Sequence, residues 1–271
     1  MKMRNLLSFL FVFPLFSSCE LTKEIDYETI YDGDKIVVHG FINAMDGVNV
    51  IVKKSVSPDN VTGIDQLNDV SIDLYEDGFK VQSLVAVNDC LYSTPTLFNV
   101  KSGSNYNIAV VSEGLPKVIS LSQPIFLPVE IDSLFLIIDE LTYYANLIAS
   151  FNNNLHFEGS FYLKVFYFIN GEIDSSRIDS EIFNPYSLID NTKNGVNVIE
   201  KQVGHVSGFD SLKVELYTLS PDLTEFLQSF QKYDSSKEDP FFEQTYPVYT
   251  NIEGGYGIFG SYSYTTYLIK K

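Results

Sequence analysis

The chain has 271 residues, with 18 Lys and Arg against 35 Asp and Glu, which gives a formal net charge of −17. A hydrophobic fraction of 45% is enough to build cores, so the composition excludes wholesale disorder. So acidic a chain lacks the basic surface that nucleic-acid phosphates or anionic lipid heads require, and we predict no nucleic-acid partner. The two cysteines also exclude a disulfide-rich scaffold.

The N-terminus has the three parts of a secretory signal. Lys2 and Arg4 supply positive charge, residues 6–16 form a short apolar run, and Cys19 follows two serines. The run is about half of the roughly 20 residues that span a bilayer, which argues against a transmembrane helix. A cysteine after small residues resembles a bacterial lipobox, whose thiol is acylated. We therefore predict a lipoprotein signal peptide over residues 1–18 and a membrane anchor at Cys19; the alternative is an ordinary signal with a chance cysteine.

Residues 19–34 form a polar segment that is predicted to be a lipidated tether. Acidic residues directly after the lipidated cysteine resemble the surface-export signal of Bacteroidota lipoproteins. This predicts an outer-membrane protein exposed at the cell surface, with a periplasm-facing position as the alternative. The second cysteine, Cys90, is predicted to be a buried or partly buried small apolar residue.

Short segments rich in aromatic and β-branched residues come next, which favours strands. The pair Asp77-Gly78 lies between apolar runs and indicates a tight hairpin, because both turn positions need positive φ. Residues 35–122 are therefore predicted to form a β-sandwich of immunoglobulin or transthyretin-like type. The predicted strands are residues 35–42, 48–56, 70–75, 80–87, 105–111 and 117–121.

Pro124 and Pro128 mark an extended linker or edge segment, because proline cannot donate to a sheet ladder. Residues 129–271 are predicted to form a second, antiparallel β-rich module, with a hairpin turn at Asn170-Gly171. The fold class is thus mainly β. The predicted strands of this module are residues 132–138, 145–152, 160–169, 173–180, 196–204, 211–219 and 261–269.

One amphipathic helix is predicted near residues 221–233. Ser220 is a suitable N-cap and Pro221 suits the first helical position. Four apolar residues then follow at helical spacing: Leu223, Phe226, Leu227 and Phe230. Since this spacing forms one apolar stripe, we expect the helix to pack on the second sheet.

Residues 255–260 fit the pattern G-x-G-x-x-G. A dinucleotide site needs this pattern between a strand and a helix, whereas the eleven residues that follow here have the composition of a strand. We therefore predict no cofactor, and instead a tight turn or bulge with Tyr256 and Phe259 packing beside it.

Other signatures of chemistry are absent from the sequence. His39, His156 and His205 are far apart and have no ligand neighbour at metal-binding spacing. No G-x-S-x-G string marks a nucleophile elbow. We predict no catalytic residue and no metal site, although acidic loops such as Glu76-Asp77 leave a calcium site open.

Aromatic residues are the most suggestive feature, with 18 Tyr and 21 Phe but no Trp. Those of the second half are candidate binding residues, because exposed rings stack on sugars or hold a partner. The alternative is that they pack within the core. The candidates are Tyr246, Tyr249, Tyr256, Tyr262 and Tyr264.

Several stretches together resemble the Bacteroidota lipoproteins of domain of unknown function 4249 (DUF4249). They are residues 19–28, 35–42, 70–78, 219–221 and 239–260. The last is close to the family's "SNI-GGLGIFG" ending and departs from it at Tyr256, where the family usually has Leu. No catalytic residue is known to us for the family, so none is carried over.

The family's members often resemble accessory lipoproteins of TonB-dependent outer-membrane transport. The resemblance therefore implies a non-enzymatic accessory or binding component of a TonB-dependent nutrient-uptake system, with a TonB-dependent receptor as its partner. One alternative is a structural or adhesive surface lipoprotein without a transport partner. A hydrolase of unrecognised type is a third reading.

Overall fold

The computed structural model describes residues 31–57, 67–95, 98–153, 159–177, 182–190, 195–237 and 246–271. Of these, Gly33–Lys271 belong to one compact unit. The predicted signal peptide, Cys19 and the tether up to residue 30 lie outside the described residues, as does His156. None of the helices in the described part of the chain is long and apolar enough to cross a membrane.

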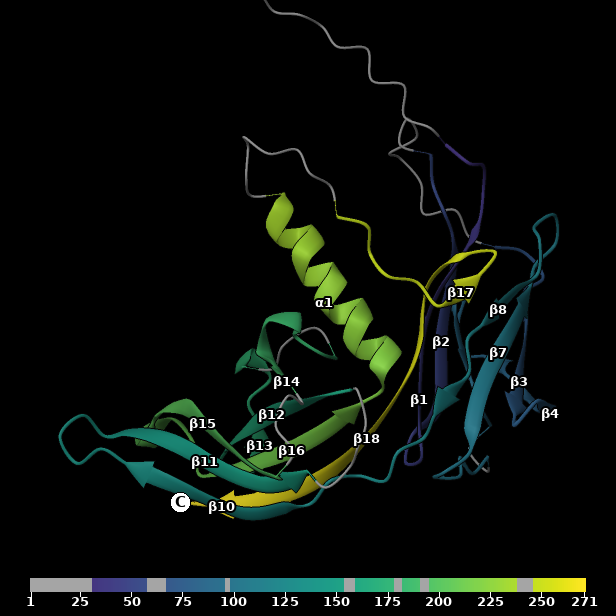
Figure 1. The fold of residues 1–271 in the computed structure, drawn as a ribbon. Helices are drawn as coiled ribbons and strands as arrows, with labels where there is room; N and C mark the ends of the chain where they lie inside the picture. The colour runs from purple at the N-terminus through teal and green to yellow at the C-terminus, as the bar shows by residue number, and fades with distance from the viewer. Residues whose placement is uncertain are drawn as a thin grey trace, which may run out of the picture. The chain divides into compact units, whose positions relative to one another are not determined.

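The described residues form three β-sheets and one α-helix, so the mainly β prediction is confirmed (Figure 1). The nine-stranded sheet has the order β13 (Glu172–Ile173), β12 (Ser160–Ile169), β16 (Ser211–Leu219), β18 (Tyr256–Lys270), β1 (Ile36–Asn43), β2 (Gly47–Lys54), β6 (Leu91–Ser93), β5 (Val85–Ala86), with β14 (Leu188–Asp190) beside β12. The six-stranded sheet has the order β17 (Ile252–Glu253), β8 (Val118–Ser120), β7 (Asn105–Val111), β3 (Ser71–Glu76), β4 (Phe79–Ser83), with β9 (Gln123–Pro124) beside β7. The three-stranded sheet contains β10 (Ile131–Ile138), β11 (Tyr144–Asn153) and β15 (Gly195–His205).

The long strand β18 connects the two ends of the chain. Its first half pairs in parallel with β1, from Val37 opposite Tyr256 to Ile42 opposite Ser261. Its second half pairs antiparallel with β16. The parallel pairing was not predicted, and it places the C-terminal strand within the sheet of the N-terminal sandwich. Whether residues 35–122 and 129–271 are separate domains stays a prediction, since they share this sheet.

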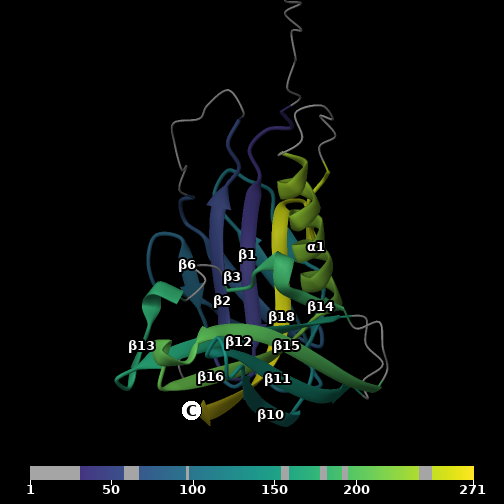
Figure 2. The same cartoon turned by 90° about the vertical axis from the view of Figure 1, so that its left-hand side faces the viewer.

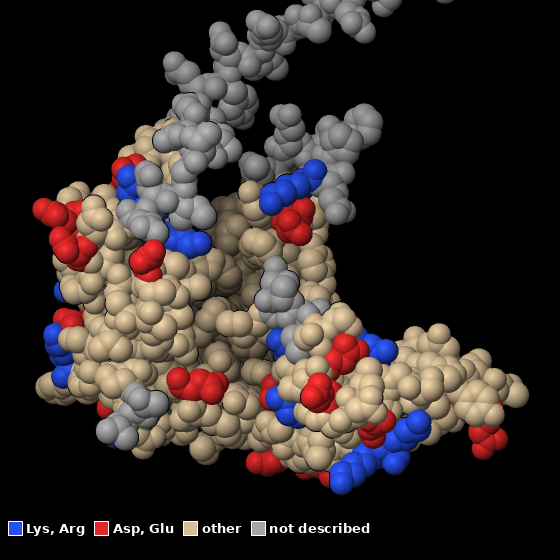
Figure 3. All heavy atoms as spheres, turned by 180° about the vertical axis from the view of Figure 1, so that it is seen from behind, with Lys and Arg blue, Asp and Glu red and all other residues tan. Residues whose placement is uncertain are grey.

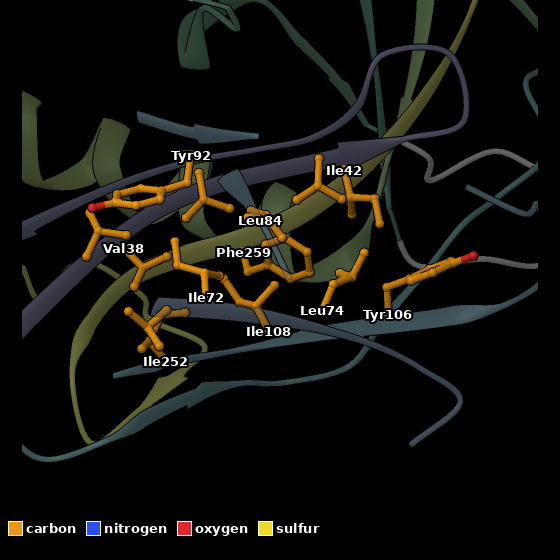
Figure 4. Packing of buried hydrophobic residues seen from close by; sticks show 14 of the residues in the cluster. Val38, Ile42, Ile72, Leu74, Leu84, Tyr92, Tyr106, Ile108, Ile252 and Phe259 are labelled. Atoms are coloured by element: carbon orange, nitrogen blue, oxygen red, sulfur yellow. The ribbon is translucent and has the colours of Figure 1, made fainter. Parts of the chain in front are cut away.

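Three apolar cores lie against the nine-stranded sheet. The first lies between it and the six-stranded sheet, where Phe259 is surrounded by Ile72, Leu84 and Ile108 (Figure 4). The second is shared with the three-stranded sheet, whose strand β11 contributes Leu147. The third lies on the other face of β18, beneath the helix α1 (Pro221–Ser236). The three cores together fix the strands of the nine-stranded sheet, which also form the groove described below.

The two predicted hairpin turns are confirmed. Asp77 and Gly78 have φ of 48° and 86°, and Asn170 and Gly171 have φ of 54° and 80°. Both pairs thus adopt the positive φ that a tight two-residue hairpin requires. They join β3 to β4 and β12 to β13.

The predicted strands 80–87 and 173–180 are both interrupted in the structure. Residues 80–87 divide between β4 and β5, which belong to different sheets, because Leu84 turns inward and is only 8% exposed. The predicted strand 173–180 is wrong over residues 174–177, which follow the short β13. There the side chain of Asp174 accepts from the Ser176 amide at 3.1 Å and a 3₁₀ turn forms over Ser175–Arg177. Residues 178–181 lie outside the described part.

The helix forms as predicted and extends to Ser236. The Ser220 hydroxyl accepts from the Leu223 amide at 3.4 Å, and Pro221 opens the helix. Leu223 and Leu227 are buried, and Phe226 is partly buried against the same core. Two more 3₁₀ turns, Pro185–Ser187 and Val206–Gly208, complete the helical elements of the described residues.

We predicted a glycine-rich turn followed by a strand from residue 261. The strand β18 already begins at Tyr256, so residues 256–260 belong to the strand. Gly257 has φ of 106° and lies so close to β1 that a Cβ there would be 1.9 Å from the Val38 carbonyl oxygen. Gly260 admits the helix, since a Cβ there would be 2.9 Å from that of Leu223. The string therefore permits close packing within a strand, and it leads into no helix.

A candidate apolar groove

A groove of about 860 Å³ lies on the face of β1 and β2 that is turned away from the sandwich core. Side chains alternate along β1, so Ile36 and Val38 point into the core while Val37, His39 and Phe41 form the floor of the groove. Ile51 of β2 lies opposite His39 and continues this floor. The floor is thus the outer face of two strands whose inner face is closed.

Two walls come from the C-terminal third of the chain. Phe226 and Phe230 of α1 form one wall, and residues 247–250 form the other. Figure 2 shows β2, β1 and β18 side by side, with α1 over this part of the sheet. Phe183, just before the 3₁₀ turn Pro185–Ser187, and Pro185, its first residue, close one end. Figure 3 shows a hollow here whose inside is tan, with charged side chains at its rim.

Hydrogen bonds to Asp222 fix the helix relative to the wall segment. Its carboxylate accepts from the Tyr249 hydroxyl and from the Asn251 amide, both at 3.0 Å, and from Gln123. The Asn251 side chain also pairs with both backbone groups of Phe259 at 2.9 Å. Burial and the Asp222 charge raise the pKa of Tyr249, which therefore stays a hydrogen-bond donor. The groove is consequently held in shape by side chains that connect α1, β18 and residues 249–251.

His39 is the titratable side chain on the floor. Its ring meets the Phe226 ring edge to face, with centroids 5.9 Å apart. The surrounding groove lowers the pKa of His39 by removing water around the imidazolium, and the positive charge of Lys53 lowers it further. The neutral ring, which both donates and accepts a hydrogen bond, is therefore favoured at neutral pH.

The end of the groove where β1 begins carries positive charge. Lys53 lies opposite Val37 in the pairing of β2 with β1. Lys35 places its ammonium 4.9 Å from the centre of the Tyr256 ring and donates to the Tyr256 hydroxyl at 3.2 Å. The opposite end, around Phe41 and Phe183, is aromatic.

The predicted binding aromatics fall into two groups. Tyr249 and Tyr256 line the groove, and Tyr246, 42% exposed, precedes the lining residues 247–250. Tyr262 and Tyr264 lie on one face of β18, within the aromatic cluster of the third core. There Tyr262 meets Phe183 with ring centroids 5.3 Å apart.

The other residues considered from sequence lie elsewhere. Cys90 is partly buried in the turn before β6, and its amide donates to Asn88 at 3.2 Å. His205 caps the 3₁₀ turn Val206–Gly208 and packs on Tyr143 and Tyr144. Over the described ranges, no three residues of the types His, Cys, Asp and Glu lie close enough to hold a metal ion.

Sequence reasoning missed His39, Phe41 and Ile51 as groove residues. A signal was present, because β1 has apolar side chains at Val37 and Phe41 as well as at its core positions. A strand that is apolar on both faces needs cover on both. We inferred a packed helix from its own apolar stripe, and drew nothing from the two apolar faces of β1.

Polar groups in the described lining are few: His39, Thr250 and the hydroxyls of Tyr249 and Tyr256 stand among apolar side chains, and no carboxylate, serine or cysteine is present there. Such a lining suits the binding of an apolar molecule. Fold and site thus define a mainly β protein with an open apolar groove.

The chain belongs to the family described as domain of unknown function DUF4249, whose model matches residues 22–267. A search of the curated proteins finds no match. Distantly similar solved structures include the FN1–FN3 domains of chicken CNTN1, at 11% identity and a TM-score of 0.29, covering 86% of this chain and 66% of that one, just under two thirds of its length. A candidate carbohydrate binding protein from Bacteroides uniformis is similar at 9% identity and a TM-score of 0.23. The match covers 87% of this chain and 98% of that one.

Proposed function

We propose that this protein is a non-enzymatic binding protein, anchored to the outer membrane through a lipid on Cys19 and exposed at the cell surface. Its groove holds an apolar ligand or the apolar part of one. The observation that carries the proposal is the open groove of about 860 Å³ with its apolar lining. Pockets for small molecules typically measure about 300–1,000 Å³ and are lined in the same way.

The uncovered apolar floor supports binding over a purely structural role. Apolar surface left in contact with water is unfavourable by about 25 cal/mol per Å². Elsewhere the same strands bury their apolar side chains fully, as at Val38 and Val50. A groove that stays open beside a closed core, and is held so by the hydrogen bonds of Asp222, is typical of a site that another molecule fills.

The place of this binding protein is proposed from the N-terminal sequence and the family resemblance. A lipid-anchored protein at the surface would concentrate its ligand beside a TonB-dependent receptor and pass it on for uptake. The protein would then be an accessory component of nutrient transport, with the receptor as its partner.

Ligand binding is tested with a soluble Cys19→Ala form and a neutral dye, N-phenyl-1-naphthylamine, whose fluorescence rises in apolar surroundings. Ile51→Asn should weaken dye binding by about tenfold, because it places an amide on the floor. The matched control is Ile119→Asn in β8, at a side chain that is 37% exposed where Ile51 is 39% exposed. If the Cys19→Ala form and its Ile51→Asn and Ile119→Asn variants bind the dye equally, the groove is not the binding site.

The anchor and the partner are tested on the native lipoprotein. Cys19→Ala should move the protein from the membrane fraction to the soluble fraction, and mild cross-linking of the wild type should recover an outer-membrane β-barrel. Reproducible recovery of no β-barrel would favour the alternative, a structural or adhesive surface lipoprotein without a transport partner. Retention of the Cys19→Ala form on the membrane would rule out the lipid anchor.

A further inference from the structure

The groove is polar at one end and apolar at the other, and its floor shows this row by row. Across β2, β1 and β18 the first row is Lys53, Val37 and Tyr256. The second is Ile51, His39 and Ile258, and the third is Asn49, Phe41 and Gly260. Phe41 of the third row meets the Phe183 ring with centroids 6.1 Å apart, so the end of the groove away from Lys53 is aromatic.

Two lysines stand at the polar end. Lys53 points to the groove face, because it is two residues from Ile51 on the same strand. The positive charge of Lys53 contributes to lowering the pKa of His39 on the floor. No ion pair of Lys53 is found within the described part of the chain. Lys35 lies over the Tyr256 ring, on the other side of Val37 from Lys53. Two cations at one mouth are notable in a chain with a net charge of −17.

Among the described residues, the acidic side chains identified around the groove have other partners than Lys53. Asp222 and Glu225 of α1 act on Tyr249, on the wall, and Asp222 is bonded by three donors. Asp34 forms an ion pair with Lys54 at 3.1 Å. Within the part of the chain that the structure describes, Lys53 thus has no ion pair at this end of the floor.

We propose that the groove binds an anionic amphiphile, a single apolar chain that ends in a carboxylate. The chain lies along the floor toward Phe41 and Phe183, and the carboxylate lies between Lys53 and Lys35, where His39 donates a further hydrogen bond. The proposal rests on the proposed function of the groove and names the ligand class that it takes. The ligand is a free monomer and not a membrane lipid, because the lining encloses one groove of about 860 Å³ and not a flat face.

The test compares three molecules with the same chain and different ends: dodecanoate, dodecanol and dodecyltrimethylammonium. Each competes with N-phenyl-1-naphthylamine for the soluble Cys19→Ala form, below its micelle concentration. Dodecanoate should bind about fivefold more tightly than dodecanol, and the cation should bind least. Added salt should shrink the difference, because ions screen the lysine charge.

Lys53→Gln should reduce the preference for dodecanoate over dodecanol from about fivefold to about twofold, because Lys35 and His39 remain, and should leave dodecanol binding unchanged. Lys54→Gln is the matched control, because Lys54 is the next residue of β2, points to the other face and is paired with Asp34. It should keep the preference for the carboxylate. Equal affinity for the three molecules, or no effect of Lys53→Gln, would overturn this inference and leave the proposed function standing.

Two further outcomes separate the remaining cases. If folded protein binds the dye but none of the three chains displaces it, the ligand class is wrong. If no chain and no dye binds, the proposed function fails together with the inference. Sedimentation with phosphatidylglycerol vesicles should leave the Cys19→Ala form in solution, and co-sedimentation that Lys53→Gln abolishes would identify a lipid surface as the ligand instead.

Discussion

The two faces of β1 have opposite fates although they alternate residue by residue. Ile36, Val38 and Ile42 are at most 1% exposed, because the six-stranded sheet covers that face completely. Val37 and Phe41, on the other face, line an open groove. The difference lies in the cover and not in the strand: a second sheet closes one face, whereas one helix and a short segment cover only part of the other.

The comparison shows how one strand serves stability and binding together. The closed face gains from complete burial, with Phe259 packed so tightly against Gly40 that a Cβ there would be 2.8 Å from the ring. The open face forgoes part of this gain and keeps a site that is rigid because the closed face is rigid. Substitutions on the closed side should therefore cost stability, and those on the open side should cost binding.

The largest effect is expected for Gly257→Ala. The new methyl group would meet the Val38 carbonyl oxygen, and φ of 106° is unfavourable for any residue with a Cβ. We expect a loss of more than about 4 kcal/mol in the free energy of unfolding, or failure to fold. Gly171→Ala is the control, because Gly171 has φ of 80° but nothing within 4 Å, so only about 1–2 kcal/mol should be lost in urea unfolding. Similar losses in the two variants would contradict the close approach of β18 to β1.

Phe259→Ala and Phe226→Ala compare the closed side with the open side directly. Phe259 is 0% exposed, and removing its ring should lower the free energy of unfolding by about 4 kcal/mol. Phe226 is only partly buried, so its loss should cost about 1 kcal/mol while weakening dye binding. Urea unfolding and dye titration of both variants measure the two quantities. A larger loss of stability from Phe226→Ala would reverse the comparison.

Asn251→Ala should have an intermediate effect. The buried amide bonds both backbone groups of Phe259 and the Asp222 carboxylate, so its removal leaves buried partners unpaired. We expect about 2 kcal/mol less stability in urea unfolding, together with weaker dye binding because the wall segment is released. Asn88→Ala is the control, because Asn88 lies in an exposed turn and its side chain accepts from two backbone amides. This variant should lose less than half as much stability. Full dye binding by Asn251→Ala would show that the wall does not depend on this residue.

Much of the fold was predictable because its signals are local. Two-residue turns such as Asp77-Gly78 and Asn170-Gly171 fix both ends of a hairpin within a few residues. The helix was predicted from Ser220 and an apolar stripe for the same reason. The prediction of one strand over residues 80–87 was wrong, because the chain changes sheets at Leu84. The local pattern continues through Leu84, and the change of sheet depends on packing against distant residues.

The site was not predictable, because it is assembled from distant parts of the chain. Lys35 and Tyr256, which meet at the mouth, are separated by 221 positions in sequence. The G-x-G-x-x-G string was recognised, but its role in admitting β1 and α1 depends on knowing that β18 lies between them. Tyr256 was named as a binding candidate among five aromatics, yet nothing in its own sequence neighbourhood separates it from Tyr262, which packs within the third core.

The smallest effect is expected from the pH dependence of His39. Because the pKa of His39 is lowered in the folded protein, the unfolded chain binds its proton more readily, and stability should fall as pH drops below about 7 through the ordinary histidine pKa. His39→Gln should remove this part of the fall between about pH 7.5 and 5.5, a window above the range in which the carboxylates of Asp73 and Glu76, whose pKa values are lowered, take up protons. The difference should be small, since the ring is accessible from the groove, and urea midpoints of both proteins at the two pH values measure it. A steeper fall in His39→Gln than in the wild type would show that the groove favours the imidazolium, and the open face would then resemble a charged site more than an extension of the core.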